Sequence, residues 1–205
     1  MKDLSEVTAQ LGDVYKEAAS VIDAYAGIEC FHTSLHGAAH SKRVLLFALL
    51  IAEAMELPEE DKRMLATAAA HHDTQRHDDW LDVGHGARAA DAYLKDKEDV
   101  SANDKLAAEI MRYHDLDDEI GEAHIESGFG ERGVLLFHIF KDADGLDRFR
   151  LGSDALDERL LRTREAKGLI DLSRDLNGRD SLGAESKFAL VVIDEARKVG
   201  EGRPV

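Results

Sequence analysis

Proline, the residue that most strongly breaks helices, is almost absent from this chain, which contains only two prolines in 205 residues. Alanine, leucine, glutamate, lysine and arginine are abundant, and no segment shows the alternation of apolar and polar residues that is typical of a β-strand. These residue types favour helix, and the apolar ones recur at helical intervals. The sequence therefore predicts an all-α fold, a bundle of about seven helices.

The bounds of the expected helices follow from apolar periodicity and from start and stop signals. Pro58 suits the first turn of a helix, and Ser101 with Asp104 three residues later resembles a capping box. The segment 115–130 is acidic and contains glycine, so we expect a loop there. The expected helices span approximately 4–26, 38–56, 58–71, 86–97, 101–114, 133–149, 154–163 and 181–199.

The length suits one domain over residues 1–205, with the helices 4–26 and 181–199 packed on its core. The nine apolar residues Val44–Ala52 are too few for a membrane span, which needs roughly 20, and they predict a buried helix. The start of the chain lacks the pattern of a signal peptide, and a single cysteine, Cys30, cannot form an intramolecular disulfide. We therefore expect a cytoplasmic protein.

The chain is strongly acidic, with 42 acidic against 26 basic side chains and a formal net charge of -16. Such a surface repels phosphate backbones, so we expect neither a nucleic-acid partner nor a membrane partner. A small anionic substrate is compatible with this charge if metal ions or local basic residues reverse the field. A homodimer is also compatible with the composition.

Histidines beside aspartates are the chemical feature that stands out. His36 and His40 lie four residues apart, which places two imidazoles on one helix face. A zinc metalloprotease of the His-Glu-x-x-His type needs glutamate directly after the first histidine, and Gly37 stands there, so we exclude that class.

His72 and Asp73 follow an alanine-rich helical segment. Adjacent residues on a regular helix point about 100° apart, so both can reach one ion only if it lies against the helix end. The pair offers a nitrogen and a carboxylate, and the second carboxylate oxygen is free to bridge to another ion. Further candidates are His85, His114 and an acidic run over residues 141–148.

The order His40-Ser-Lys-Arg-Val, then His72-Asp73, then Ala143-Asp144 resembles the HD superfamily of metal-dependent phosphohydrolases. That family is defined by one histidine, a His-Asp pair and a distant aspartate. Its first histidine commonly stands three residues before Arg-Val, which selects His40 over His36. The resemblance covers about residues 30–165 and implies a helical HD domain.

Two further segments resemble the binuclear HD proteins that hydrolyse symmetrical dinucleoside polyphosphates. They are His85-Gly-Ala-Arg-Ala-Ala and Ile110-Met-Arg-Tyr-His114. The stretch from His72 to Gly86 is also similar to a group of short HD proteins of unassigned substrate. His85 follows Asp73 by only twelve residues, so the connecting loop has to turn back sharply if both serve one ion.

The resemblance implies two divalent ions. The first would be held by His40, His72, Asp73 and Asp144, and the second by His85 and His114, with Asp73 bridging. Asp142 and Asp147 compete with Asp144, which we prefer because the last ligand of the family usually follows alanine. Imidazole and carboxylate ligands do not distinguish iron, manganese, nickel, cobalt and zinc.

The implied activity is hydrolysis of a small phosphorylated substrate, a nucleotide or a dinucleoside polyphosphate, by a metal-activated hydroxide that attacks phosphorus. Asp73 and His72 would act in catalysis as ligands, and Arg76 is our first choice to hold a substrate phosphate. HD-fold mixed-valent di-iron oxygenases share this ligand set and are the alternative. A non-catalytic nucleotide-binding sensor is a third hypothesis, which the intact ligand set disfavours.

Other residues near these motifs have open or structural roles. His36 and His71 could orient ligands or act on substrate, whereas Trp80 and Tyr113 are interpreted as packing or lid residues. The remaining histidines are expected to be surface or core residues: His32, His77, His124 and His138. The cationic side chains near the ligands are Lys42, Arg43, Arg76, Arg88, Lys141, Arg148 and Arg150, and Arg43 is expected to pair with a ligand carboxylate.

Overall fold

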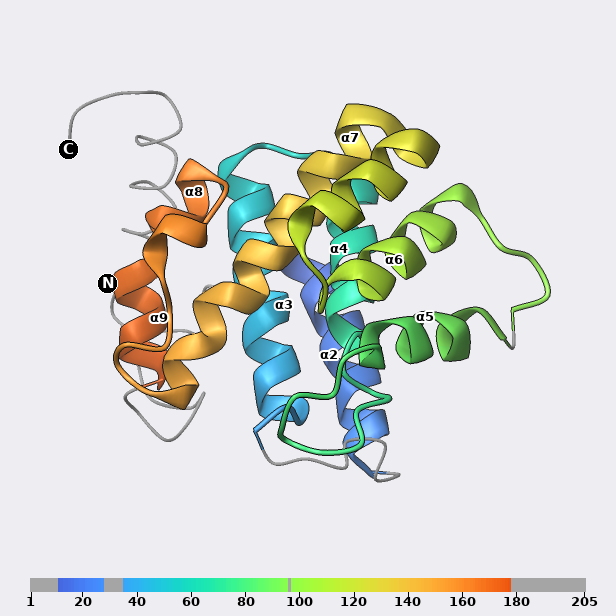
Figure 1. Ribbon diagram of the computed structural model, residues 1–205. Coiled ribbons are helices and arrows are strands. Elements are labelled where there is room, and N and C mark those ends of the chain that lie inside the picture. Colours follow the sequence, from blue (N-terminus) through green and yellow to red (C-terminus); the bar gives the residue numbers. More distant parts are fainter. Residues whose placement is uncertain (1–10, 28–34, 96, 178–205) are drawn as a thin grey trace.

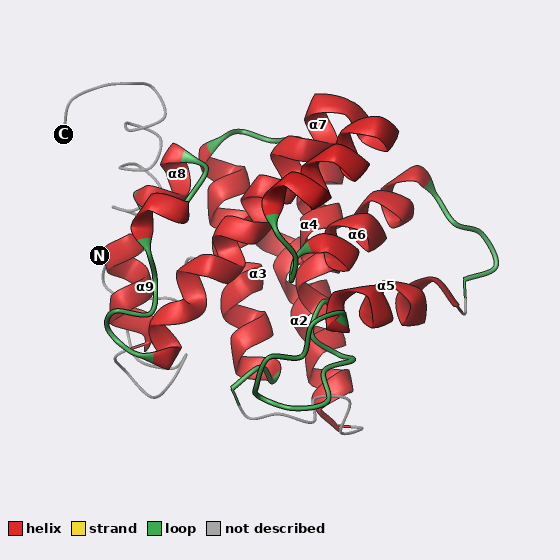
Figure 2. Cartoon of the chain, in the orientation of Figure 1, coloured by secondary structure: helices red, strands yellow, loops and turns green. Residues whose placement is uncertain are grey.

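The structure, a computed structural model, describes residues 11–27, 35–95 and 97–177. Across these residues it contains eight α-helices, two short 3₁₀-helices and no strand (Figures 1 and 2). The all-α prediction is therefore confirmed. The N-terminal part of the expected helix 4–26, the expected helix 181–199, Cys30 and His32 lie outside the described residues.

The helices in chain order are α2 (Gly12–Gly27), α3 (Ala38–Ala54), α4 (Glu59–His71), α5 (His85–Lys95), α6 (Ala102–Tyr113), α7 (Asp118–Leu146), α8 (Arg164–Lys167) and α9 (Ile170–Asn177). The 3₁₀-helices η1 (Asp147–Leu151) and η2 (Glu158–Leu160) follow α7. Two start signals are confirmed, because Pro58 precedes the first turn of α4 and Ser101 forms a capping box with Asp104.

Helix α3 forms the centre of the molecule. Its apolar run Val44–Ala52 is buried, and α2, α4 and α7 pack around it (Figure 1). A helix that is apolar on every face has to be surrounded in this way. One hydrophobic core extends from Val14 in α2 to Leu176 in α9. No helix in the described part of the chain is both long and apolar enough to cross a membrane.

The expected loop over 115–130 is wrong, because α7 begins at Asp118. The backbone reverses at Gly130, where φ is 63° and ψ is -163°, so α7 consists of two arms. Pairs across the arms run antiparallel, with Asp118 against Lys141 at 2.9 Å and Glu122 against His138 at 2.6 Å. The first arm is therefore stabilised by its contact with the second, which the acidic local composition does not indicate.

The segment after α7 also departs from expectation. The predicted helix over 154–163 is wrong except for the short turn of η2, and α8 and α9 were not predicted. Asp142 organises this region, because its carboxylate accepts hydrogen bonds from the backbone nitrogens of Arg162 and Thr163 and from the Thr163 hydroxyl. These partners are some twenty residues away, so the segment takes its shape from α7 and not from its own periodicity.

Candidate metal centre

The candidate metal ligands lie at or near the ends of five helices, and these ends meet at one place. His40 lies in the first turn of α3, and His72 and Asp73 follow the last turn of α4. His85 begins α5, His114 follows α6, and Asp144 lies near the end of α7. All but Asp144 are buried, and the Asp144 side chain is 33% exposed. The structure thus gathers all six sequence-predicted metal-site residues, and it contains three overlapping His/Asp groups that could hold metal ions.

The Asp73 carboxylate lies between two sets of histidines. Its Oδ2 atom is 3.3 Å from His40 Nε2 and 3.6 Å from His72 Nε2. Its Oδ1 atom is 3.0 Å from His85 Nε2 and 3.7 Å from His114 Nε2. On the first side, Asp144 Oδ1 lies 3.3 Å from His40 Nε2. One carboxylate therefore faces two clusters of nitrogen donors.

Each of the four histidines is oriented through its other ring nitrogen. The Nδ1 atoms of His72, His85 and His114 contact backbone carbonyl oxygens, those of Ala69, Asp82 and Met111, at 3.0, 2.7 and 2.7 Å. A carbonyl can only accept, so Nδ1 carries a proton in each of these rings, and Nε2 is the nitrogen that faces the centre. Metal-ligating histidines are held in this way in many proteins.

His40 is oriented by a side chain instead of a carbonyl. Its Nδ1 atom lies 2.7 Å from Oδ2 of the buried Asp147. Arg43 donates to the same carboxylate. Arg43 therefore pairs with the carboxylate that orients a candidate ligand and not, as expected, with a ligand itself.

The nitrogen and oxygen atoms of the centre are suited to bind cations. Asp73 Oδ1 is buried and has no hydrogen-bond partner among the described residues, which is costly for a carboxylate oxygen unless a cation satisfies it. The Nε2 atoms of His40 and His72 are 3.2 Å apart, and those of His85 and His114 are 3.0 Å apart. Imidazole nitrogens and carboxylate oxygens are the ligands that divalent transition metals prefer, and here they lie close together.

The pKa directions agree with this arrangement. Burial lowers the pKa of His72 to about 3, so its ring is neutral. Burial alone would also lower the pKa of His40, but hydrogen bonds to Asp144, Asp147 and Asp73 raise it to about 10. Burial would raise the pKa of Asp73, yet the surrounding histidines hold it well below its usual value. The carboxylates that attract a proton to His40 would attract a metal cation in the same place.

Gly86 permits the close approach of α5 and α6. A Cβ atom at this position would lie 2.2 Å from the carbonyl oxygen of Met111 and 2.8 Å from Nδ1 of His114. Only glycine lets the start of α5 lie against the end of α6, and this contact places His85 beside His114. The loop after Asp73 turns back sharply, as the twelve-residue spacing between Asp73 and His85 requires.

The three aspartates that compete as ligands differ in their contacts. Asp147 orients His40, and Asp142 binds the segment after η2, so Asp144 is the aspartate of the acidic run that reaches the centre. His36 Nδ1 lies 3.1 Å from Asp73 Oδ2, at the edge of the first cluster. His71 faces away, where its Nδ1 contacts the Tyr25 hydroxyl at 2.9 Å. Burial lowers the pKa of His71 to about 4.

The remaining histidines and aromatic residues also have defined places. His124 stacks on Tyr113 and His138 pairs with Glu122, so neither belongs to the centre. Trp80 is 83% exposed and lines the cavity, so a packing role is wrong for it, and the lid interpretation stays a prediction.

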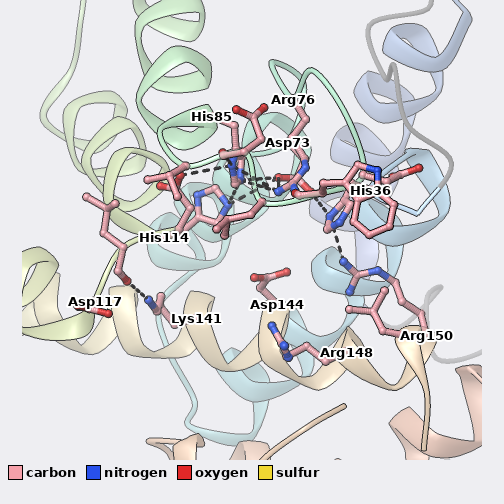
Figure 3. Close-up of a pocket in the computed structure, with 18 residues that line it drawn as sticks. His36, Asp73, Arg76, His85, His114, Asp117, Lys141, Asp144, Arg148 and Arg150 are labelled. Atoms are coloured by element: carbon pink, nitrogen blue, oxygen red, sulfur yellow. Dashed lines mark hydrogen bonds and ion pairs between the residues drawn. The ribbon is translucent and has the colours of Figure 1, made fainter.

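The centre lies at the base of an open cavity of about 510 Å³. Figure 3 shows Asp73, His85 and His114 on one side of it, with Lys141, Asp144 and Arg148 on the helical wall opposite and Arg150 beside His36. Six carboxylates and four cationic side chains line the cavity, so two divalent ions would make it positive. It can therefore attract an anion although the protein is acidic.

Sequence reasoning missed several residues that shape this site. The role of Asp147 in orienting His40 was not predicted. The only sequence feature that points to it is its position three residues after Asp144. Asp115 was also missed as a positioning residue. Its Oδ2 accepts a hydrogen bond from the Gly84 nitrogen at 2.5 Å, which holds the end of the loop beside His85.

The cationic side chains near the centre differ in how many of their nitrogens already have a hydrogen-bond or ion-pair partner. Arg76 Nε and Nη2 donate to the carbonyls of Asp78 and Trp80, and its Nη1 lies 3.2 Å from His85 Nε2. Arg148 is exposed and donates through Nε to Ala155, while within the described ranges neither of its Nη atoms has a hydrogen-bond partner. Lys42 and Arg88 pair with Asp23 and Asp82.

Comparison with known proteins adds no assignment to this geometry. No family model, curated protein or solved structure matches the chain. The all-helical fold with buried His/Asp clusters that could bind metal is what the chain itself provides.

Proposed function

We propose that the protein is an HD-type phosphohydrolase with two divalent metal ions, acting on a small phosphorylated substrate. The observation that carries this proposal is the position of Asp73, whose two oxygens face separate histidine clusters. His40, His72, Asp73 and Asp144 would hold one ion, and His85 and His114 with Asp73 would hold the other. Ions bound there would supply Lewis acidity, which brings the pKa of a water near ~7 and neutralises phosphate oxygens.

The residues of the cavity would bind and orient the substrate. Beside Asp144, Arg148 offers two Nη atoms that have no partner in the described part of the chain, which suits two phosphate oxygens at once (Figure 3). Arg76 would contribute only Nη1, because its other nitrogens hold the loop carbonyls. Cations on the wall opposite Asp73 favour an anionic substrate, which supports the hydrolase over an oxygenase that acts on a neutral polyol.

Metal content tests the site. We expect about two transition-metal ions per chain in protein purified without chelator, and about one in His114→Ala, because His114 faces only Oδ1 of Asp73. Asp73→Asn should lose most of both ions. The control is His124→Ala, which removes an exposed histidine outside the centre. Unchanged metal content in both site variants would overturn the assignment.

The reaction class needs a separate experiment. Phosphate release should occur without oxygen, should survive exchange of iron for manganese or cobalt, and should increase with pH as the activated water ionises. Arg148→Ala should raise KM more than it lowers kcat, since a phosphate contact binds ground and transition states alike. If no phosphorylated compound is hydrolysed, and iron-loaded protein consumes oxygen with a polyol or phosphonate, the oxygenase alternative is correct.

A further inference from the structure

Four of the eight exposed large apolar side chains of the described residues lie at the metal cavity. Trp80, Leu81, Val83 and Leu151 line it, with exposed fractions of 83%, 92%, 58% and 44%. Leu35, 42% exposed, is hydrogen-bonded through its backbone to Asp79 and Arg150, which also line the cavity. Clustered exposed apolar groups beside a functional cavity indicate a binding surface.

The loop that carries Trp80 is held in place through its polar groups. Arg76 Nη2 donates to the Trp80 carbonyl at 2.7 Å, and the Trp80 nitrogen donates to Asp78 Oδ1 at 2.8 Å. Asp82 accepts from the His77 nitrogen and from Arg88. The backbone is thus anchored while the apolar side chains face solvent, so their exposure is not the result of an unstructured loop.

The same contacts connect the loop to the candidate ligands. Arg76 Nη1 is 3.9 Å from Asp73 Oδ1, and the Asp82 carbonyl is the acceptor for His85 Nδ1. The loop therefore has a set position relative to the centre. A molecule with its anionic end among Arg148, Lys141 and the metal ligands would have its other end at the apolar mouth.

We propose that Trp80, with Leu81 and Val83, binds a flat apolar group of the substrate, so that the preferred substrate is a phosphate compound that carries an aromatic ring. This inference rests on the proposed function, which supplies the phosphate end. Trp80 is then a specificity-determining residue that contacts the part of the substrate that does not react. Stacking of a ring on the exposed indole would strengthen binding about 3- to 10-fold over an alkyl group of similar charge.

A binding experiment tests this inference without turnover. Trp80 is the only tryptophan of the chain, so its fluorescence reports directly on the cavity mouth. Zinc-loaded protein should bind phenylphosphonate about 3- to 10-fold more tightly than methylphosphonate by calorimetry, and phenylphosphonate alone should quench Trp80 fluorescence. Trp80→Ala should abolish the preference and Trp80→Phe should restore it. Leu160→Ala, which removes an exposed leucine outside the cavity lining, should leave it unchanged.

A turnover experiment separates this inference from the proposed function. Benzyl and ethyl phosphate have leaving alcohols of similar acidity, so a lower KM for benzyl phosphate that disappears in Trp80→Ala would reflect recognition of the ring. Hydrolysis of both esters with equal KM would leave the hydrolase intact and overturn the inference. Absence of hydrolysis, together with a Trp80-dependent preference for phenylphosphonate, would support the aromatic site and reject the hydrolase. If Trp80→Ala dissociates a dimer and leaves the ligand preference unchanged, the surface joins two copies and the inference is wrong.

Discussion

Asp147 determines how His40 is presented to the candidate metal centre. The two residues are 107 positions apart, and the contact between His40 Nδ1 and Asp147 Oδ2 is 2.7 Å long. A carboxylate behind a metal-binding imidazole fixes the ring and increases its basicity, and loss of such a partner lowers metal affinity about 10- to 100-fold. Asp147 therefore matters for the centre although it does not face the cavity.

We expect Asp147→Asn to weaken zinc binding about 10- to 100-fold at the ion on the His40 side, because an amide holds the imidazole less firmly. Competition with a chromophoric chelator would measure the two affinities, and circular dichroism would verify the helical fold. Asp154→Asn removes an exposed aspartate outside the centre and is the matched control. Equal affinities in Asp147→Asn and the native protein would contradict the orienting role.

Helix α7 shows how one glycine allows two helical arms to pack. Gly130 has φ 63° and ψ -163°, a conformation that is open almost only to glycine, and nothing lies within 4 Å of a Cβ at this position. Gly128 also has open space around it but has no positive φ. The two positions differ in backbone conformation and not in available space.

Gly130→Ala should therefore lower the free energy of unfolding by about 1 to 3 kcal/mol, through backbone strain alone. Gly128→Ala, in the helical first arm, should raise it by up to about 1 kcal/mol, because alanine has the higher helix propensity. Urea unfolding followed by circular dichroism would measure both. A destabilised Gly128→Ala with an unaffected Gly130→Ala would show that the reversal at Gly130 is misplaced.

The start of α6 combines a cap with an ion pair. Asp104 accepts hydrogen bonds from the Ser101 nitrogen and the Tyr93 hydroxyl, and Lys97 lies 2.9 Å away. Burial works against ionisation of Asp104, but the hydrogen bonds from Ser101, Tyr93 and Lys97 outweigh it and lower its pKa. The folded pKa is thus below the value of about 3.9 in an unfolded chain. Ionised Asp104 stabilises the fold above this pH, and its contribution is lost as the pH falls through the folded pKa.

Asp104→Asn should lower the free energy of unfolding by about 1 to 2 kcal/mol at pH 7, the usual cost of losing a cap. The difference from the native protein should shrink as the pH falls below about 4. Denaturant titrations at several pH values would measure this dependence. Asp99→Asn makes the same charge change just before the helix and should have little effect. If the variant were less stable than the native protein by the same amount at every pH, the carboxylate charge of Asp104 would not contribute to stability.

The candidate centre is formed by residues that are far apart in the sequence. Its residues lie in α3, α5 and α7 or directly after α4 and α6, so ions bound there would link five helices of the bundle. A ligand that binds only the folded state stabilises it by about 2.7 kcal/mol at a concentration one hundred times its dissociation constant. Metal removal should therefore reduce the stability of the whole bundle.

We expect a chelator to lower the Tm of the native protein by about 5 to 10 °C, the shift that ~3 kcal/mol produces in a domain of this size. Asp73→Asn should show almost no response to the chelator, because it has little bound metal to lose. Scanning calorimetry or a thermal dye assay would measure both. An identical Tm with and without chelator in the native protein would exclude metal as a stabilising ligand.

Fold class could be predicted along the chain because its signals are local: periodicity and the scarcity of proline indicated the helices. The candidate ligands were predicted differently, through the resemblance of the order His40, His72-Asp73 and Asp144 to the HD superfamily. Histidine and aspartate beside helix ends are informative without a partner, since the helix end itself sets where they point.

Packing alone decided the rest. The first arm of α7 is helical because Asp118 meets Lys141 across the turn at Gly130, and neither the pair nor the reversal can be recognised from local composition. The separate roles of Asp142, Asp144 and Asp147 depend on which long-range partner each one meets. Asp147 orients His40 and the Trp80 side chain is exposed at the cavity mouth because distant segments pack together, and sequence spacing carries no information about those contacts.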